Sequence, residues 1–318
     1  MPSLVARVGL AALSGCSTVL GLDDLVADRD DAGSTTTGTG STTTTTSGSG
    51  GCASTCGTPG CGTCPATART PVPAAGGDYE IDRYEVTIEQ YSAWLATGPS
   101  TAGQTARCPW NDSFEPGVIS QAARDAAAAA GLEIGTKCDD WLASKGPLDQ
   151  QKPITCIDYC DAVAYCAWAG GHLCGKIGGG TLDVTSDQFD TNATDPELSE
   201  WYRACSNAGA QLYPYGDTYM AGTCNDTNGH IEAVGTFSGC EGGYPDIFDM
   251  SGNVGEWEDA CTNYGGTALA GQNCLRVGGA YYDDAVTLTC GKDAAGDTVN
   301  HQTVLSIPSD GTGFRCCK

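Results

Sequence analysis

The sequence is poor in basic residues, with 15 lysines and arginines against 39 aspartates and glutamates, which gives a formal net charge of −24. It has no basic patch, which argues against nucleic acid and against electrostatic binding to anionic lipid. Histidine is scarce too, and none of the three histidines stands in a recognisable metal motif. The motif Gly-x-Ser-x-Gly is absent and no Ser-His-Asp arrangement is indicated, so a hydrolase is the least favoured class.

A long apolar run is missing from the N-terminus. Val8–Leu13 is apolar but too short to span a bilayer, and Arg7 precedes it, so residues 1–15 are predicted to be a signal peptide. The sequence Leu13-Ser-Gly-Cys16 is similar to a bacterial lipobox, in which the signal peptidase cuts before the cysteine and its sulfur carries a diacylglycerol. An ordinary signal peptide with a nearby cleavage site is the alternative.

Acyl chains on Cys16 would hold the protein firmly on a membrane. An aspartate directly after the lipidated cysteine is associated with inner-membrane retention, and this chain has Ser17 at that position instead. We therefore expect a lipid-anchored protein of the cell envelope, on the outer membrane and facing the periplasm or the cell surface. Residues 16–51 are acidic at first and then almost wholly Gly, Ser and Thr, a composition that predicts a flexible tether.

Cysteine, by contrast, is abundant. Nineteen cysteines would be very unusual in a reducing cytosol, and their spread along the chain favours disulfides over a single metal cluster. If Cys16 carries lipid, the even number that remains can form nine disulfides.

The first four of these, Cys52-x3-Cys56-x4-Cys61-x2-Cys64, lie close together. Their spacing lacks the two separated knuckles of many zinc sites, so a two-disulfide knot is favoured over zinc in an oxidising compartment. Pro65–Gly77 is rich in proline and glycine and is predicted to be a linker, so that residues 52–77 precede a globular domain at 78–318.

The globular domain opens with Tyr79–Val86, which has the alternation of a strand. Thr87 and Gln90 form the pattern of a capping box, which predicts a helix beginning next to Thr87. Residues 97–152 look like an insertion, with a short Ala-rich helix at Gln121–Ala130 and a disulfide between Cys108 and Cys138, whose pairing is a guess.

Two further helices are predicted, at Cys156–Gly170 and Leu198–Cys205. Asp158 or Asp161 stands near the start of the first, where the helix dipole favours an acid, and glycine ends it.

The stretch Phe248–Asp259 combines two flexible glycines with the oxygen-bearing side chains of Asn253 and Glu256. A loop with turned carbonyls and one carboxylate suits a hard cation such as calcium. On spacing alone, a tight turn between two core strands is the favoured interpretation.

Taken in order, the motifs of residues 78–318 resemble the formylglycine-generating enzyme (sulfatase-modifying factor) family. They are Ile81-Asp-Arg-Tyr-Glu-Val-Thr87, Ala164-Tyr-Cys-x-Trp-Ala-Gly170, Glu200-Trp-Tyr202, Tyr213-Pro-Tyr-Gly-Asp217, Phe248-Asp-Met-Ser-Gly-Asn-Val-x-Glu-Trp257, Arg276-x-Gly-Gly-Ala-Tyr281 and Gly313-Phe-Arg-Cys316. The resemblance implies a single α+β domain related to the C-type lectin fold, loop-rich, low in regular secondary structure and disulfide-stapled.

The same resemblance implies structural calcium. One ion would be held by the Glu256 carboxylate with the carbonyl groups of Ser251, Gly252 and Val254. A second would involve Asn225 and the carbonyl of Asp226. In this context the loop changes from a favoured tight turn to a predicted calcium site.

Disulfides are implied as well. The family pattern carries over as Cys166–Cys316 and Cys205–Cys290. Proximity in the sequence suggests two more pairs, Cys224–Cys240 and Cys261–Cys274.

The catalytic residues of the family do not carry over. Its enzymes bind copper(I) through two cysteines that follow a Gly-Gly-Ser-Tyr strand, and linear two-thiolate binding suits that soft ion. Here Asp283 stands at the first cysteine position, and Ala280 replaces the serine. Copper is therefore not expected, and no catalytic residue is assigned.

The sequence favours a non-catalytic module that binds an unknown protein or glycan, is held on a membrane by Cys16 and acts as a monomer. An oxidoreductase with another metal, such as non-haem iron, is the alternative. Its ligands would be Asp283 and Asp284 with His172 or His301. His172 is more simply interpreted as a turn residue.

Overall fold

The computed structural model describes Cys52 and residues 54–318 except 119–120, 122–123, 126–137, 139–148, 185–190, 263–272, 293, 296–300 and 305–307. Ser49–Lys318 form one compact unit. The signal peptide, Cys16, the tether and most of the helix predicted at Gln121–Ala130 lie outside the described residues. Within the described part, no helix combines the length and the apolar character needed to cross a membrane.

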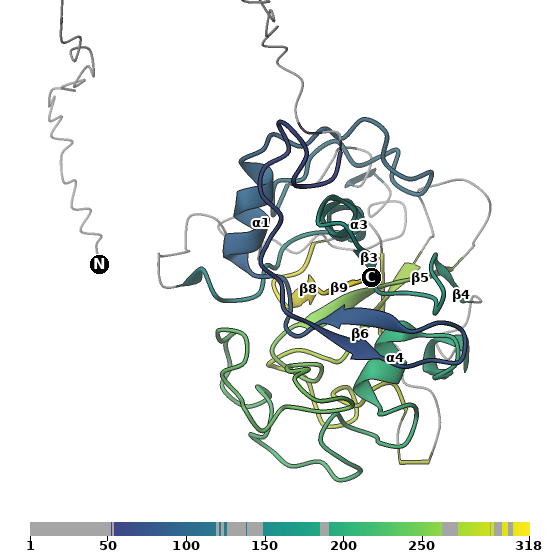
Figure 1. The fold of residues 1–318 in the computed structure, drawn as a ribbon. Helices are drawn as coiled ribbons and strands as arrows, with labels where there is room; N and C mark the ends of the chain where they lie inside the picture. The colour runs from purple at the N-terminus through teal and green to yellow at the C-terminus, as the bar shows by residue number, and fades with distance from the viewer. Residues whose placement is uncertain are drawn as a thin grey trace, which may run out of the picture. The chain divides into compact units, whose positions relative to one another are not determined.

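One sheet joins the two ends of the domain. Its strand order is β1 (Arg69–Val72), β2 (Tyr79–Asp82), β9 (Cys316–Cys317) and β3 (His172–Leu173), with antiparallel neighbours throughout. Figure 1 shows the C-terminus next to β3, with which β9 pairs. The predicted linker Pro65–Gly77 therefore contains a strand, which is a correction: Thr70 and Val72 are buried in alternation with exposed neighbours.

The second sheet is built around a long buried strand, β5 (Gly255–Thr262). Its strands run in the order β4 (Leu182–Val184), β5, β6 (Asn273–Val277) and β7 (His301–Val304), and β8 (Thr312–Phe314) pairs in parallel with β5. The predicted calcium loop leads directly into β5. Strand β6 leads directly into the loop around Asp283, where the resemblance places the family's copper cysteines.

Helix α1 (Ile88–Leu95) begins as predicted, because the Thr87 side chain accepts from the Gln90 backbone amide and the Gln90 side chain accepts from the Thr87 amide. Helix α3 (Tyr159–Trp168) starts later than predicted. Its N-cap is Asp158, whose side chain accepts from the Asp161 backbone amide. The Asp161 side chain accepts from the Asp158 amide, so both candidate acids cap the helix. Helix α4 (Glu200–Cys205) follows the 3-10 helix η3 (Thr191–Thr194) and is capped by Ser199.

The capping acid of α3 gives a pH-dependent prediction. Burial raises the pKa of Asp158 to about 7, whereas an unfolded aspartate ionises near pH 4. The folded state therefore holds a proton that the unfolded state has lost. This group makes stability fall as pH rises from about 4 to about 7, by up to about 1.4 kcal/mol per pH unit.

Asn caps helices as well as Asp does and cannot ionise. The unfolding free energies of Asp158→Asn and of the natural protein are measured at pH 4.5 and pH 7. The unfolding free energy of the variant, minus that of the natural protein, should be larger at pH 7 than at pH 4.5. A difference that stays constant, or that shrinks with pH, would contradict this account of Asp158.

Helices α1 and α3 pack through aromatic side chains. The Tyr91 and Tyr165 rings stack with centroids 5.7 Å apart, and Trp94 meets Tyr165 edge-on at the same distance. Phe314, at the end of β8, meets Tyr165 edge-on at 5.5 Å. The core thus ties both helices to β8 and, through it, to the central strand β5.

All cysteines among the described residues form disulfides, and they make nine pairs, the number expected. They are Cys52–Cys61, Cys56–Cys64, Cys108–Cys160, Cys138–Cys156, Cys166–Cys316, Cys174–Cys317, Cys205–Cys290, Cys224–Cys240 and Cys261–Cys274. The two pairs implied by the resemblance, the two guessed from proximity and the two-disulfide knot are confirmed.

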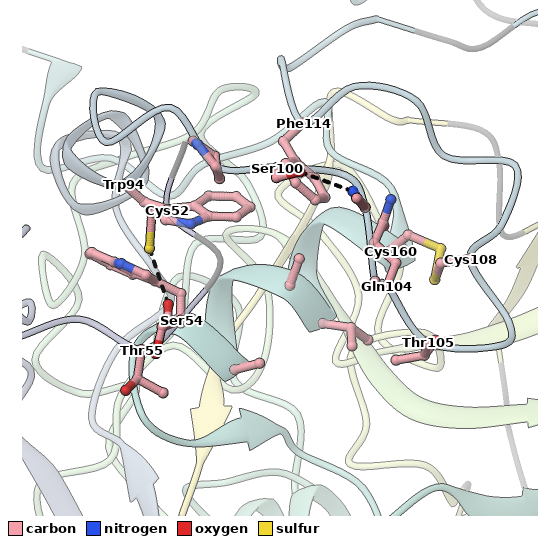
Figure 2. A pocket seen from close by; sticks show the side chains of 17 residues that line it. Cys52, Ser54, Thr55, Trp94, Ser100, Gln104, Thr105, Cys108, Phe114 and Cys160 are labelled. Atoms are coloured by element: carbon pink, nitrogen blue, oxygen red, sulfur yellow. Dashed lines mark hydrogen bonds between the residues drawn. A yellow bond between two sulfur atoms is a disulfide. The ribbon is translucent and has the colours of Figure 1, made fainter. Parts of the chain in front are cut away.

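The predicted pair Cys108–Cys138 is wrong. Cys108 bonds to Cys160 on α3, which Figure 2 shows, and Cys138 bonds to Cys156 just before that helix. The inserted region is therefore fastened to α3 by one disulfide and to the segment just before α3 by the other, and not to itself. Sequence spacing could not show this, because the partners meet only when the chain is folded.

Candidate functional site

Asp283, which the resemblance places at the family's first copper cysteine, is a salt-bridged aspartate. Asp283 Oδ2 accepts hydrogen bonds from Arg276 Nη2 at 2.5 Å and from the Ala280 backbone amide at 2.8 Å. Gly278 and Gly279, with φ of 84° and 68°, turn the chain from β6 into this loop. The carboxylate of Asp283 thus closes the turn and neutralises Arg276.

The surroundings of Asp283 are aromatic and partly exposed. The Arg276 guanidinium lies 5.9 Å from the Tyr282 ring centre, and Tyr282 is 47% exposed. Asp284 accepts from the Thr287 amide and fixes the next turn. These contacts are those of a structured surface loop.

Copper(I) does not fit this site. It is held by thiolates in the family, and every described cysteine is in a disulfide. The Asp283 carboxylate is a hard ligand that is already paired with a cation. The chemistry of the donor set therefore gives no place for copper at this loop.

Two of the residues named for another metal, His172 and Asp283, have separate partners. His172 Nε2 lies 3.0 Å from the Glu200 carboxylate, and this bond raises the pKa of His172. Asp283 instead bonds Arg276, and His301 stands opposite Arg276 in the β6–β7 ladder. His172 and Asp283 therefore serve different parts of the fold, β3 with α4 in one case and β6 in the other.

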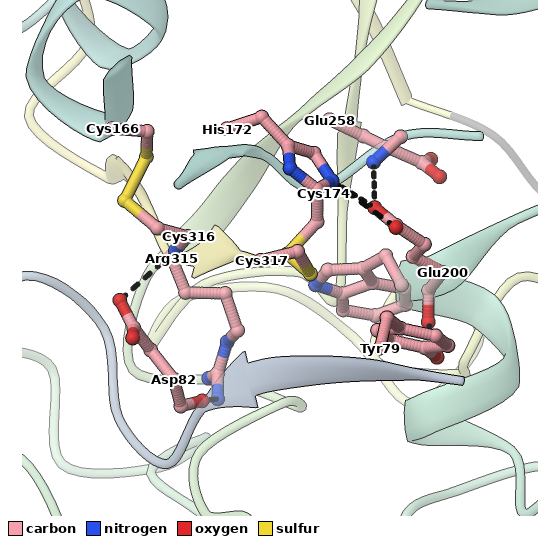
Figure 3. The surroundings of a disulfide bond; sticks show 12 residues. Tyr79, Asp82, Cys166, His172, Cys174, Glu200, Glu258, Arg315, Cys316 and Cys317 are labelled. Carbon is pink, nitrogen blue, oxygen red and sulfur yellow. Dashed lines mark hydrogen bonds and ion pairs between the residues drawn. A yellow bond between two sulfur atoms is a disulfide. The ribbon is translucent and has the colours of Figure 1, made fainter. Parts of the chain in front are cut away.

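Sequence reasoning missed the cluster around His172, which Figure 3 shows. The Cys174–Cys317 disulfide lies beside Glu200, and ligand atoms of these three residues fall within 4.8 Å of one another. Both sulfurs are used in the disulfide, and Glu200 also accepts from the Gly175 amide at 2.9 Å. The cluster therefore fastens the chain end and leaves no thiolate for a metal.

The predicted carboxylate ligand of the first calcium ion, Glu256, accepts hydrogen bonds from two buried side chains. The two oxygens of Glu256 accept from Arg315 Nε and Nη2, and Trp201 Nε1 donates to Oε2 at 2.8 Å. Two carboxylate oxygens offer about four acceptor sites. Arg315 and Trp201 supply three N–H donors to these sites, so the role of Glu256 as a calcium ligand, like those of the Ser251, Gly252 and Val254 carbonyls, stays a prediction.

The second predicted site fits better. Asn225 is 1% exposed, and its Oδ1 has no hydrogen-bond partner among the described residues. Its carbonyl accepts from the Asn253 amide at 2.9 Å, so the fold brings this segment against the loop before β5. A Cβ on Gly252 would lie 2.4 Å from the Asn225 carbonyl oxygen, which explains glycine there.

The side-chain carboxylate of the neighbouring Asp226 already accepts two hydrogen bonds. Its oxygens accept from the Tyr219 hydroxyl at 2.7 Å and the Gly222 amide at 3.0 Å. The role of the Asp226 carbonyl oxygen as a calcium ligand stays a prediction.

A buried charge cluster surrounds Arg315, a residue to which the sequence motif assigned no role. Its guanidinium faces Glu256 directly, with Glu85 and Asp249 close by. Burial raises the pKa of Asp249 to about 6, and burial, with the charge of Asp249, also raises the pKa of Glu85. Three acids thus share one buried cation.

A family model described as the sulfatase-modifying factor enzyme 1-like domain matches residues 41–318. No curated protein matches the chain. Solved structures that match the chain include PvdO from Pseudomonas aeruginosa, which is 19% identical; the match covers 79% of this chain and 90% of PvdO, with a TM-score of 0.44. CarF is 18% identical; the match covers 76% of this chain and 86% of CarF, with a TM-score of 0.40. Treponema denticola variable protein 1 is 13% identical; the match covers 79% of this chain and 91% of that protein, with a TM-score of 0.40. Since the family model spans most of its length, the chain belongs to the family of sulfatase-modifying factor enzyme 1-like domains.

Proposed function

We propose that this domain is a non-catalytic binding module of its family, displayed outside the cytoplasm. The observation that carries the proposal is Asp283, which forms an ion pair with Arg276 at the position of the family's first copper cysteine. The family includes oxidoreductases. In this chain, however, the loop offers a closed salt bridge in place of thiolates. The partner is a protein or a glycan.

The proposed location follows from the disulfides and the N-terminal sequence. Nine disulfides among the described residues favour an oxidising compartment. The lipobox-like sequence ending at Cys16 supports a lipid anchor on the outer membrane, with residues 16–51 as the tether. The anchor would hold a monomeric domain within reach of ligands at the envelope.

A thiol count tests the absence of a thiolate pair. The natural protein, alkylated without reduction and weighed by mass spectrometry, should carry no alkyl group on any cysteine from Cys52 to Cys317. Two alkylated cysteines within this domain would reveal a free pair suited to copper, and the non-catalytic proposal would fail.

We also propose that calcium stiffens the domain at the Asn225 site. The buried, unpartnered Asn225 Oδ1 supports this, because calcium prefers side-chain and carbonyl oxygens and would supply the missing partner. The adjoining carbonyls of the Ser251–Val254 loop and of Asp226 are the other proposed ligands.

Calcium added after chelation should raise the melting temperature by several degrees, since a ligand at 100 times its Kd contributes about 2.7 kcal/mol. Asn225→Ala should remove most of this shift, because it deletes the unpartnered oxygen. The matched control, Asn228→Ala, changes an exposed asparagine in the same loop and should keep it. Equal shifts in the two variants, or no shift in the natural protein, would refute calcium at Asn225.

A further inference from the structure

A cavity of about 360 Å³ lies on the side of the domain formed by the N-terminal knot, the inserted region and helix α3. Ser54 and Thr55 of the knot stand at one end and the Cys108–Cys160 disulfide at the other, as Figure 2 shows. This volume falls within the range of small-molecule sites, and an apolar cavity of about 150 Å³ is enough for benzene. The cavity is separate from Asp283 and from the predicted calcium ligands, none of which lines it.

The lining has an apolar floor and a polar mouth. The floor is made of Trp94, Phe114, Val163, Ala164, Ala167 and Trp168. Hydroxyl groups of Ser54, Thr55, Ser100 and Thr105 belong to the rest of the lining, and Thr55 and Thr105 are exposed. None of the described residues that line the cavity is charged, although the chain carries a net charge of −24.

The walls are fixed before any ligand arrives. The Cys52–Cys61 disulfide holds the knot, and Cys108–Cys160 ties the inserted region to α3. Trp168 Nε1 donates to the Cys61 carbonyl at 2.8 Å, which sets the indole against the knot. The side-chain amide of Gln104 donates to the Asn111 carbonyl at 2.8 Å and holds the inserted loop. A preformed site spends little free energy on ordering its side chains when it binds.

We propose that this cavity binds the apolar end of a neutral amphiphile, an alkyl or acyl chain that carries an uncharged, hydroxyl-bearing head. The chain would lie on Trp94, Phe114 and the exposed face of α3, where burying apolar surface is favourable. The head would meet the hydroxyl groups at the mouth. A charged head gains no partner from this lining, and an anionic head is also repelled by the net charge of the protein. This ligand goes beyond the protein or glycan partner proposed above, and its binding does not depend on that partner.

Octyl glucoside, kept below its micelle concentration, is a suitable probe, and glucose and octanoate are its matched controls. The full chain is used with Cys16→Ser, so that no acyl group of its own and no detergent competes. Octyl glucoside should change the tryptophan fluorescence saturably. Glucose should not, and octanoate should bind at least ten-fold more weakly. Saturable binding of glucose as tight as that of octyl glucoside would identify a sugar site and overturn the proposal, as would equal binding of octanoate or no saturable binding.

Substitutions that fill the cavity test whether octyl glucoside binds there. Ala167→Phe fills the floor from an exposed position on α3, and Thr55→Trp fills it from the knot; each should weaken octyl glucoside binding at least ten-fold. Ala93→Phe adds the same side chain at an exposed position on α1 outside the cavity and should bind like the natural protein. Equal affinity in all three variants would contradict the assignment. The titration does not depend on catalysis, so its failure is distinguishable from that of the non-catalytic proposal.

Discussion

Removing both disulfides that hold the C-terminus should cost the domain more than twice what the removal of either one costs. Cys166–Cys316 and Cys174–Cys317 close loops of 150 and 143 residues, and they end on adjacent cysteines. While one is intact, the other closes a circuit of only about nine residues, which is worth about 3 kcal/mol in the chain-entropy model. Once the first is lost, the second closes a circuit of about 60 residues that runs through Cys205–Cys290, and it is worth about 4 kcal/mol.

The measurement is the unfolding free energy of three variants with alanine at the cysteines. Cys166→Ala with Cys316→Ala, and Cys174→Ala with Cys317→Ala, should each lose about 3 kcal/mol, and the variant with all four changes about 7 kcal/mol. If both double variants fold and the variant with all four changes does not, that outcome also supports the prediction. A fourfold loss no larger than the sum of the two double variants would show that the disulfides do not share one loop.

Replacing Arg315 by methionine should destabilise the domain by roughly 3–5 kcal/mol, because removal of one partner leaves a buried, unpaired charge. Arg315 is 0% exposed, and its partner Glu256 is 1% exposed. The loss should shrink below about pH 6, where Asp249, whose pKa burial raises to about 6, is protonated and adds no repulsion. Denaturant unfolding at pH 5 and pH 7.5 measures both effects.

Two further variants separate charge from packing. Arg83→Met removes an ion pair with Asp246 in which both side chains are at least a third exposed, and it should cost no more than about 1 kcal/mol. Adding Glu256→Gln to Arg315→Met removes the stranded carboxylate and should recover part of the loss. If Arg315→Met is no worse than Arg83→Met, the buried cluster does not organise this core.

Local signals were predictable from the sequence, because they depend on neighbours in the chain. Thr87 and Gln90 cap α1 as their spacing indicates, and the acids at the start of α3 both take part. Strand β1 was missed because Pro71 and Pro73 suggested a linker. It is an edge strand, where a proline is tolerated since one side of the strand forms no ladder bonds.

Contacts between distant segments were predictable only where the family resemblance supplied them. Cys166–Cys316 came from that resemblance, whereas the partner of Cys108 depended on how the insertion folds back on α3. The Glu256–Arg315 pair spans 59 residues, and no local pattern marks it. The cavity between the knot, the insertion and α3 likewise exists only in the folded chain.

The central claim is that this domain has exchanged the copper chemistry of its family for binding. The most direct measurement is incubation of the purified protein, with copper and oxygen, with a sulfatase-type peptide that contains the target cysteine, followed by mass spectrometry for the aldehyde product. With Asp283 bonded to Arg276 and the described cysteines in disulfides, the peptide should stay unchanged. Enzyme-dependent conversion of the cysteine to the aldehyde would contradict the account.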